Sequence, residues 1–314
     1  MQKAKASLKP AIHGIAYGVG LSTRLSLASG RSFILMYHGV SDEADRSGSF
    51  EKQLAYLNRH FDIVSVEHLL SRIKNGSRQG KIPVAITFDD GLKNNFTHVA
   101  PVLRKHHIPA TFFVCPALVD SGAWLWNIEA RLRLMSLPAA GLQTFLARNE
   151  IPGSTAEAAI DWMKEQPIAV RRVIEQRIRA ATPSFVPSQE QHQRYDLMNW
   201  SEIAALPELI TIGSHTNHHP ILTTLNQEEL LEEITGSKNA LENRLQRPCH
   251  LFCYPNGSND ASVVHAVSQH YKAALCVDEG YVSPADDPYQ LKRIAVQPET
   301  GMAQFTWQLH RADY

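Results

Sequence analysis

The segment Ala85-Ile86-Thr87-Phe88-Asp89-Asp90-Gly91 places two adjacent carboxylates directly after an apolar run. The run from Val84 to Phe88 has the character of a buried strand, and Gly91 marks the turn that ends it. Two adjacent acids past a core strand either repel each other, which raises one pKa, or share a cation. The segment therefore predicts a strand that carries a charged site at its carboxyl end.

A second segment offers further ligands for a cation. Residues 213–220 read GSHTNHHP and follow a short apolar run. His215 and His219 are four residues apart, which puts both imidazoles on one face if the segment turns helically. One carboxylate with two imidazoles leaves coordination positions for water and substrate, the pattern of a catalytic zinc-type site.

The rest of the chain alternates short apolar strands with helical patterns. The strand at 32–37 delivers His38 at its carboxyl end, and the strand at 291–296 carries Arg293. A βα rhythm with functional-looking residues at the ends of several strands favours a (β/α) barrel over an open sheet. The α/β fold class predicted here is thus a barrel, with Asn226 expected to cap a long helix that runs to about Arg247.

Residues from about 120 to 197 change character, because helical patterns there are punctuated by prolines. We predict a helical insertion on a βα loop, where insertions usually shape a substrate cleft. Trp124 and Trp126 open this insertion. They are expected either to stack on a sugar ring or to anchor the insertion.

Composition excludes some functions. Lysine plus arginine and aspartate plus glutamate both total 31, so the net charge is zero and nucleic-acid binding has no support.

The four cysteines show no CxxC spacing, and they are predicted to be free core thiols in a reducing compartment, with a disulfide pair as the alternative. They are Cys115, Cys249, Cys253 and Cys276.

The first 30 residues form a basic segment whose apolar residues recur at near-helical spacing, and no acidic residue occurs before position 42. No run in it reaches the roughly 18 residues of a membrane span. A cleaved secretion signal, a helix packed on the domain and an amphipathic segment on an anionic membrane are the three alternatives. We expect a cytoplasmic protein with peripheral contact at the inner face of the membrane, secretion being the lesser alternative.

With these motifs in place, the chain resembles the polysaccharide deacetylase family over about residues 31–120 and 197–300. The resemblance rests on TFDDG at 87–91 and HTNHHP at 215–220. It implies an incomplete, distorted (β/α) barrel, here residues 31–314, that removes acyl groups from amino sugars. By this likeness Asp90, His215 and His219 hold a divalent metal, most simply Zn²⁺, and Asp89 is the general base. His218 is the competing ligand, and the motif favours His219.

The third motif departs from the family pattern FRPPYG and reads FCYPNG at 252–257. Cys253 stands where an arginine normally braces the catalytic aspartate, and we predict that Arg293 replaces it. Asn256 is expected to lend its backbone N–H to the oxyanion, with Tyr254 and Pro255 beside it in substrate binding.

The YHGV string at 37–40 is similar to one in the subgroup that deacetylates poly-N-acetylglucosamine. By that likeness His38 is the general acid, which protonates the departing amine after water, activated by the metal, attacks the acyl carbon. Expected substrates are N-acetylated glycans or a lipid-linked sugar carrying an acetyl or formyl group. The alternatives are an inactive metal- or carbohydrate-binding homologue and a glycoside hydrolase that uses Asp89 and Asp90.

Overall fold

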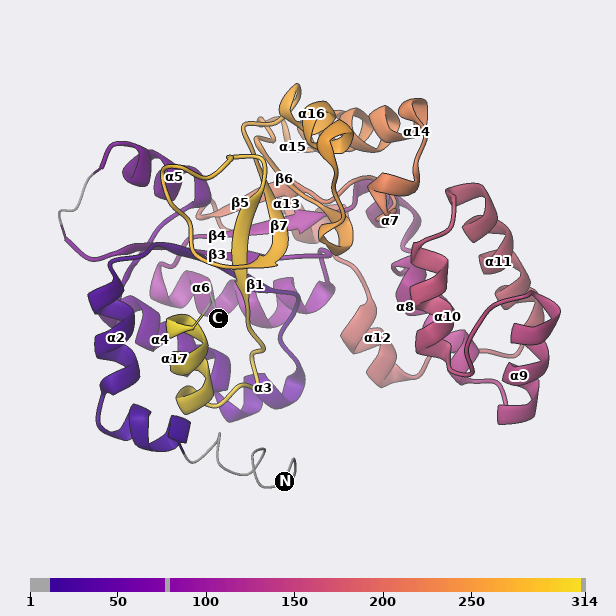
Figure 1. The fold of residues 1–314 in the computed structure, drawn as a ribbon, viewed down its shortest axis with the longest axis horizontal. Coiled ribbons are helices and arrows are strands. Elements are labelled where there is room, and N and C mark those ends of the chain that lie inside the picture. Colours follow the sequence, from indigo (N-terminus) through magenta and orange to yellow (C-terminus); the bar gives the residue numbers. More distant parts are fainter. Residues whose placement is uncertain (1–11, 77–79, 312–314) are drawn as a thin grey trace.

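A computed structural model describes residues 12–76 and 80–311, and its centre is a closed barrel of seven parallel strands (Figure 1). β1 pairs with β3 on one side and β8 on the other, which closes the ring. The predicted (β/α) barrel is confirmed. Its ring has seven strands and not eight, because the remaining strand, β2 (Asp62–Ile63), pairs only with the start of β3. In ring order the strands are β1 (Phe33–Tyr37), β3 (Pro83–Phe88), β4 (Ala110–Val114), β5 (Ile210–Ser214), β6 (Leu251–Cys253), β7 (Ala273–Glu279) and β8 (Leu291–Ala295).

Alternate residues of the strands build two hydrophobic layers, as the two-residue period of a strand requires. One set fills the barrel interior and includes Ile34, Ala85, Phe113 and Leu275. The helix α5 (Val66–Lys74) adds Val66 and Leu69 to this set and closes the amino-terminal end of the barrel. The opposite end stays open for polar side chains.

The other set of strand residues faces outward and packs against a ring of helices. These helices are amphipathic and bury one stripe each, so the barrel is enclosed on its outside. They are α3 (Asp42–Ser47), α4 (Ser49–His60), α6 (Ala100–His106), α7 (Pro116–Ser121), α13 (Trp200–Ala204), α14 (Gln227–Leu231), α15 (Ser237–Leu245), α16 (Ala261–Ser268) and α17 (Met302–His310). The helix α2 (Leu21–Ser29) does not belong to this ring and packs on α17.

The long helix expected after Asn226 is interrupted. Asn226 caps it as predicted, with its side chain accepting from the N–H of Glu229. Between α14 and α15, however, Glu232–Gly236 form a π-helical turn, and the last helix ends at Leu245. Such turns insert one residue into a helix and frequently occur at functional sites.

Of the seven helices between β4 and β5, the middle five lie beside the barrel (Figure 1, pink). They have a hydrophobic core of their own, which includes Trp126, Ile160 and Ile174 and which Ile221 joins from the barrel side. We call this group the helical insertion. Its helices are α8 (Trp126–Met135), α9 (Ala139–Arg148), α10 (Ala156–Lys164), α11 (Ile168–Ala181) and α12 (Gln189–Tyr195).

The four cysteines are buried and free, as predicted. Within residues 12–76 and 80–311, no helix has the length and apolar character needed to cross a membrane. The basic residues Lys3, Lys5 and Lys9 of the predicted amphipathic segment lie outside the described residues.

Candidate active site and metal centre

Both aspartates of the TFDDG segment lie at the carboxyl end of β3. Asp89 continues the inward-facing positions of the strand and is 3% exposed, and Asp90 is 8% exposed. Asp90 has a φ of 70°, in the left-handed region that non-glycine residues rarely adopt. Backbone strain of this kind clusters at active sites and ligand clamps, and here it turns the two carboxylates in different directions.

Asp90 faces both histidines expected from the second segment. Its Oδ1 lies 3.5 Å from Nε2 of His215 and 3.5 Å from Nε2 of His219. All three side chains are buried, and their ligand atoms lie within 4.8 Å of one another. The structure therefore brings together the three residues that the sequence predicted as metal ligands.

The arrangement fits a metal better than it fits a hydrogen-bonded cluster. Nδ1 of His215 lies 2.8 Å from the carbonyl oxygen of Cys253, so this nitrogen donates and Nε2 presents its lone pair. Burial lowers the pKa of His219 to about 3, which keeps that imidazole neutral. Nδ1 of His219 is buried without a partner among the described residues.

A second group, Asp89 with His215 and Cys253, also places three ligand atoms within 4.8 Å. We assign the cation to Asp90 instead, for two reasons. Both oxygens of Asp89 accept hydrogen bonds from Arg293. Burial raises the pKa of the Cys253 thiol, which favours the neutral form, and a metal ligand must be the thiolate.

Arg293 reaches Asp89 across the barrel interior from β8. Its Nη1 donates to Oδ1 and its Nη2 to Oδ2 of Asp89, each at 2.7 Å, and the guanidinium is completely buried. Burial opposes the charged form of Asp89, but the charge and hydrogen bonds of Arg293 outweigh it and hold the pKa of the carboxyl below its usual value. Cys253, at the family arginine's place in the third motif, contacts both partners.

The loop that carries His219 is held from two sides. On one side, the indole Nε1 of Trp126 in the helical insertion donates to the His219 carbonyl at 2.9 Å. On the other, the buried carboxylate of Glu233, in the π-helical turn, accepts from the N–H groups of Asn217 and His218. The loop needs this support because His219, with a φ of 55°, lies in the left-handed region.

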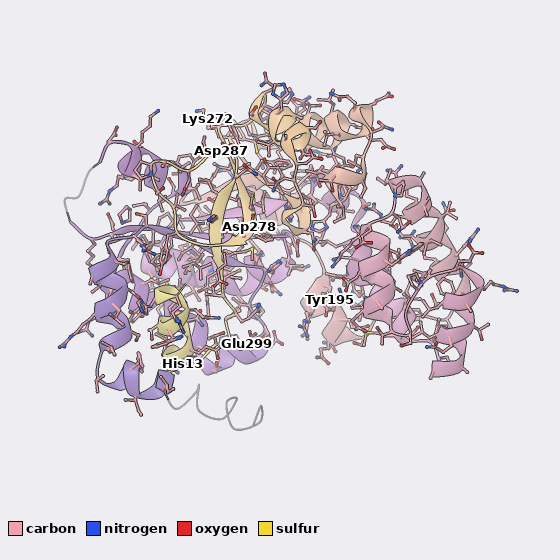
Figure 2. The ribbon with its side chains drawn as sticks, in the orientation of Figure 1. His13, Tyr195, Lys272, Asp278, Asp287 and Glu299 are labelled. Carbon is pink, nitrogen blue, oxygen red and sulfur yellow. The ribbon has the colours of Figure 1, made fainter. Side chains whose placement is uncertain are left out.

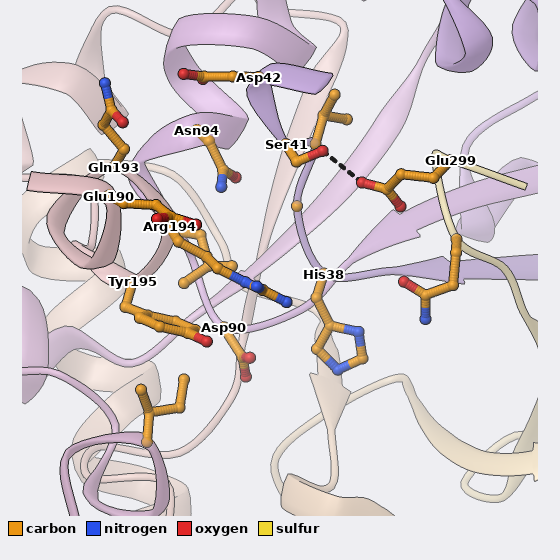
Figure 3. Close-up of a pocket in the computed structure, with 15 residues that line it drawn as sticks. His38, Ser41, Asp42, Asp90, Asn94, Glu190, Gln193, Arg194, Tyr195 and Glu299 are labelled. Carbon is orange, nitrogen blue, oxygen red and sulfur yellow. Dashed lines mark hydrogen bonds between the residues drawn. The ribbon is translucent and has the colours of Figure 1, made fainter. Parts of the chain in front are cut away.

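His38 lies at the carboxyl end of β1 and is exposed to a pocket of about 650 Å³ (Figure 3). The pocket lies between the barrel and α12, and Asp90 also lines it. Burial opposes the charged forms of Asp89 and Asp90, and the charge of His38 is one of those that lower the pKa of each carboxyl group. The imidazole of His38 therefore lies near both carboxylates. No hydrogen bond fixes the ring within the part of the chain that the structure describes.

Three aromatic residues that were candidates for contact with substrate have structural positions. The side chain of Tyr254 is fully buried, and its hydroxyl donates to the Tyr289 carbonyl. Trp124 donates to the Asp196 carboxylate, and its indole is 9% exposed. Trp126 is 6% exposed. Both indoles are anchors, the second of the two alternatives, because neither has a free face for a sugar.

The remaining predicted residues are placed as follows. Pro255 is buried, while Asn256 is exposed with a φ of 55°. No hydrogen bond within the described chain uses the Asn256 N–H, which leaves it available to an oxyanion. His218 is half-exposed and lies 2.7 Å from Glu233, so it points away from Asp90 and is not the competing ligand.

The sequence analysis expected the insertion to shape a cleft, but it did not identify the pocket wall formed by α12. Glu190, Gln193, Arg194 and Tyr195 of this helix line the pocket, and Arg194 extends toward His38 (Figure 3). Tyr195 lies where the insertion meets the barrel (Figure 2). The helix buries no residue, so it has no apolar period that sequence reasoning could detect.

Comparison with known proteins agrees with the fold. Residues 76–275 match the family model described as polysaccharide deacetylase. The Streptococcus pyogenes deacetylase PplD superposes with a TM-score of 0.60 at 18% identity, over 90% of this chain and 98% of that one. IcaB from Ammonifex degensii gives 0.56 at 18% identity, over 89% and 97%. A de-N-acetylase from Aggregatibacter actinomycetemcomitans gives 0.55 at 14% identity, over 88% and 99%.

A search of curated proteins found no match. The family model nevertheless covers more than half of the chain, and the barrel carries an Asp–His group that could hold a metal ion. The chain belongs to the polysaccharide deacetylase family. The predictions of that family and of an amino-sugar deacetylase enzyme are confirmed at this level.

Proposed function

We propose that this enzyme hydrolyses the N-acetyl amide of an amino sugar in a glycan, using a divalent cation held by Asp90, His215 and His219. The observation that carries the proposal is the position of Asp90 Oδ1, at 3.5 Å from both imidazole Nε2 atoms and beside a second aspartate that is engaged elsewhere. Nitrogen and oxygen donors of this kind suit Zn²⁺. When bound, the cation would polarise the acyl oxygen and acidify a water molecule.

The base is Asp89. It accepts a proton from the attacking water while the water oxygen bonds to the acyl carbon. Arg293 holds the carboxylate in one orientation through two hydrogen bonds, so the acceptor lone pairs keep a fixed direction. Arg293 acts here as a positioning residue.

His38 is the acid, and Asn256 is the oxyanion donor. The amide C–N bond breaks when the nitrogen receives a proton from the His38 imidazole, which releases acetate and a free amine. The backbone N–H of Asn256 donates to the oxyanion before that step, a contribution of about 3 kcal/mol. The exposed ring of His38 in the pocket, free of protein hydrogen bonds, supports its role.

The polar lining of the pocket supports a glycan substrate. Its side chains include carboxylates, amides, a guanidinium and a hydroxyl, which match the donors and acceptors of a sugar. The glycoside hydrolase alternative is disfavoured, because its two carboxylates must flank the scissile bond about 5 to 9 Å apart, and adjacent residues at the end of one strand seldom do. A lipid-linked sugar at the cytoplasmic face of the membrane remains a proposed form of the substrate.

Acetate release tests the proposal. The purified chain, loaded with Zn²⁺, is assayed on N-acetylglucosamine oligomers, before and after removal of the metal with a chelator. Asp89→Asn is expected to lower the rate by about 10²- to 10⁴-fold and leave metal content unchanged. Asp90→Ala is expected to lose both acetate release and bound metal. Bound metal without acetate release from polymeric or lipid-linked substrates would favour the inactive homologue, and release of reducing ends would favour the glycosidase.

A further inference from the structure

The amino-terminal helices expose the residues that a helix usually buries. In α2, Ser22 and Ser26 are buried, whereas Leu21 is 45% and Leu27 is 36% exposed. The Ser22 hydroxyl lies 3.0 Å from the hydroxyl of Thr306 on α17, so the polar side of α2 is its packed side. This orientation is the reverse of an ordinary surface helix.

The preceding helix, residues 12–18, also exposes apolar side chains. Ile12 is 50% exposed, Ile15 68% and Val19, just after it, 63%. Among the described residues, half of the exposed large apolar side chains lie between positions 12 and 27. Figures 1 and 2 show these helices on the side of the barrel away from the helical insertion, with His13 marking the first of them.

A cationic groove adjoins this apolar face. It is open, has a volume of about 610 Å³ and lies between the first helix and α4. Lys52, Arg59 and His60 line it together with Tyr17, and no acidic residue is among the lining residues. Lys52 and Arg59 are exposed. The groove therefore presents positive charge directly beside exposed aliphatic side chains.

Two further observations indicate positive potential around the groove: the composition of the amino-terminal sequence and the pKa of His60. No acidic residue occurs among the first 41 residues, which include the exposed Arg24. Burial and the charges of Arg59 and Lys81 lower the pKa of His60, which is expected in a region of positive potential. A second copy of the chain would bring the same positive charge to the contact, so repulsion opposes a dimer through this face.

We propose that this surface, formed by Ile12, Ile15, Val19, Leu21, Lys52 and Arg59, docks on an anionic phospholipid bilayer. The aliphatic side chains enter the boundary between headgroups and acyl chains, while the groove takes lipid phosphates. The surface is separate from the catalytic pocket and stands whether or not the proposed catalysis is correct.

Vesicle sedimentation with the full chain tests the docking surface. We expect binding to vesicles that contain phosphatidylglycerol, weaker binding as salt increases, and little binding to pure phosphatidylcholine. The double variant Ile15→Glu/Val19→Glu should weaken binding at least about tenfold. Arg59→Glu, which changes the charge by two, should weaken it about 20-fold.

Two exposed residues outside the surface provide matched controls. Val186→Glu changes a side chain that is 81% exposed in the helical insertion, and Arg247→Glu changes an exposed arginine after α15. Both should bind as the unaltered protein does. The proposal is overturned if the unaltered chain ignores anionic vesicles, if the surface variants bind normally, or if the double variant instead abolishes a dimer seen by analytical ultracentrifugation.

Discussion

Arg293 and Asp89 form a two-point ion pair inside the barrel, with both nitrogen-to-oxygen distances at 2.7 Å. The two residues belong to strands that do not neighbour each other, β8 and β3. Only β1 lies between them in the ring, so the pair reaches past β1 inside the barrel, and its geometry depends on the pairing of β1 with both strands. It takes the place of the arginine that the third motif lacks.

Substituting lysine for Arg293 tests whether the pair orients Asp89. Lysine keeps the charge but cannot donate two parallel hydrogen bonds. We expect Arg293→Lys to lower kcat for acetate release about 100-fold through misorientation of the carboxylate. Zinc content should be unchanged, because Arg293 does not contact Asp90 or the histidines. Unchanged kcat in a folded variant would contradict the orienting role.

The contact between Trp126 and the His219 loop predicts a metal-affinity effect. Trp126→Phe removes the indole N–H and leaves an aromatic ring under Arg171, which lies 4.5 Å from the ring centroid. Loss of this outer support should weaken zinc binding about tenfold, measured by chelator competition. Hydrogen exchange in residues 216–220 should also become faster.

Trp124→Phe is the matched control for that experiment. Trp124 is similarly buried and also donates through its indole, but to Asp196 rather than to the metal loop. The zinc affinity of the Trp124→Phe variant should equal that of the unaltered protein. Equal losses in the two variants would mean that general loosening of the insertion, and not the His219 contact, affects the metal.

His38 as general acid predicts a dependence on the leaving group. His38→Gln should reduce acetate release from an N-acetyl sugar by about 10²- to 10⁴-fold. An activated acetate ester, whose phenolate leaves without a proton, should retain most of its rate. A variant that loses both activities equally would place His38 in binding or structure rather than in proton transfer.

Gly39 has no room for a side chain, because an added Cβ would lie 2.3 Å from Oδ1 of Asn94. The amide of Asn94 would have to shift toward the pocket that it lines, so Gly39→Ala should cost about 1 kcal/mol of stability. Gly39→Ala/Asn94→Ala should recover most of this loss, which urea unfolding of the single and double variants would measure. Normal stability of the single variant would contradict the close contact.

Glu129 gives a prediction for pH. Burial opposes its charge, but hydrogen bonds from Arg179 and Arg133 outweigh burial and lower its pKa. A lowered folded-state pKa stabilises the protein above the unfolded value of about 4.3, and this contribution is lost as the pH falls through the folded value. Glu129→Gln should therefore be about 1 kcal/mol less stable at neutral pH and equal in acid.

Urea midpoints across the pH range check this, with the exposed Glu157→Gln as the control that should match the unaltered protein throughout. A Glu129→Gln difference that persists in acid would show that shape, and not charge, causes the loss.

Local patterns were sufficient to predict the barrel, whereas the choice among the candidate metal ligands came from the family resemblance. Each strand is a short apolar run, and Asp90, His215 and His219 directly follow such runs, so their meeting at one end follows from parallel pairing. The brace by Arg293 was also predictable, because a charged residue at an inward strand position needs a partner.

What the sequence could not predict depends on long-range packing. An aromatic residue such as Tyr254 or Trp126 looks the same in the sequence whether it contacts a sugar or packs in a core. Only its burial in the folded protein distinguishes the two positions. Likewise, nothing local in the sequence marks the π-helical turn that directs Glu233 to His218. Arg194 and Tyr195 were missed because α12 has no buried face.

The helical insertion both borders the catalytic pocket and donates a hydrogen bond to the His219 carbonyl. The helical insertion thus links the preference for a sugar to the binding of the proposed cation. A chimera that exchanges this module to change the sugar preference would also loosen the cation, unless the incoming segment brings an equivalent donor to that carbonyl.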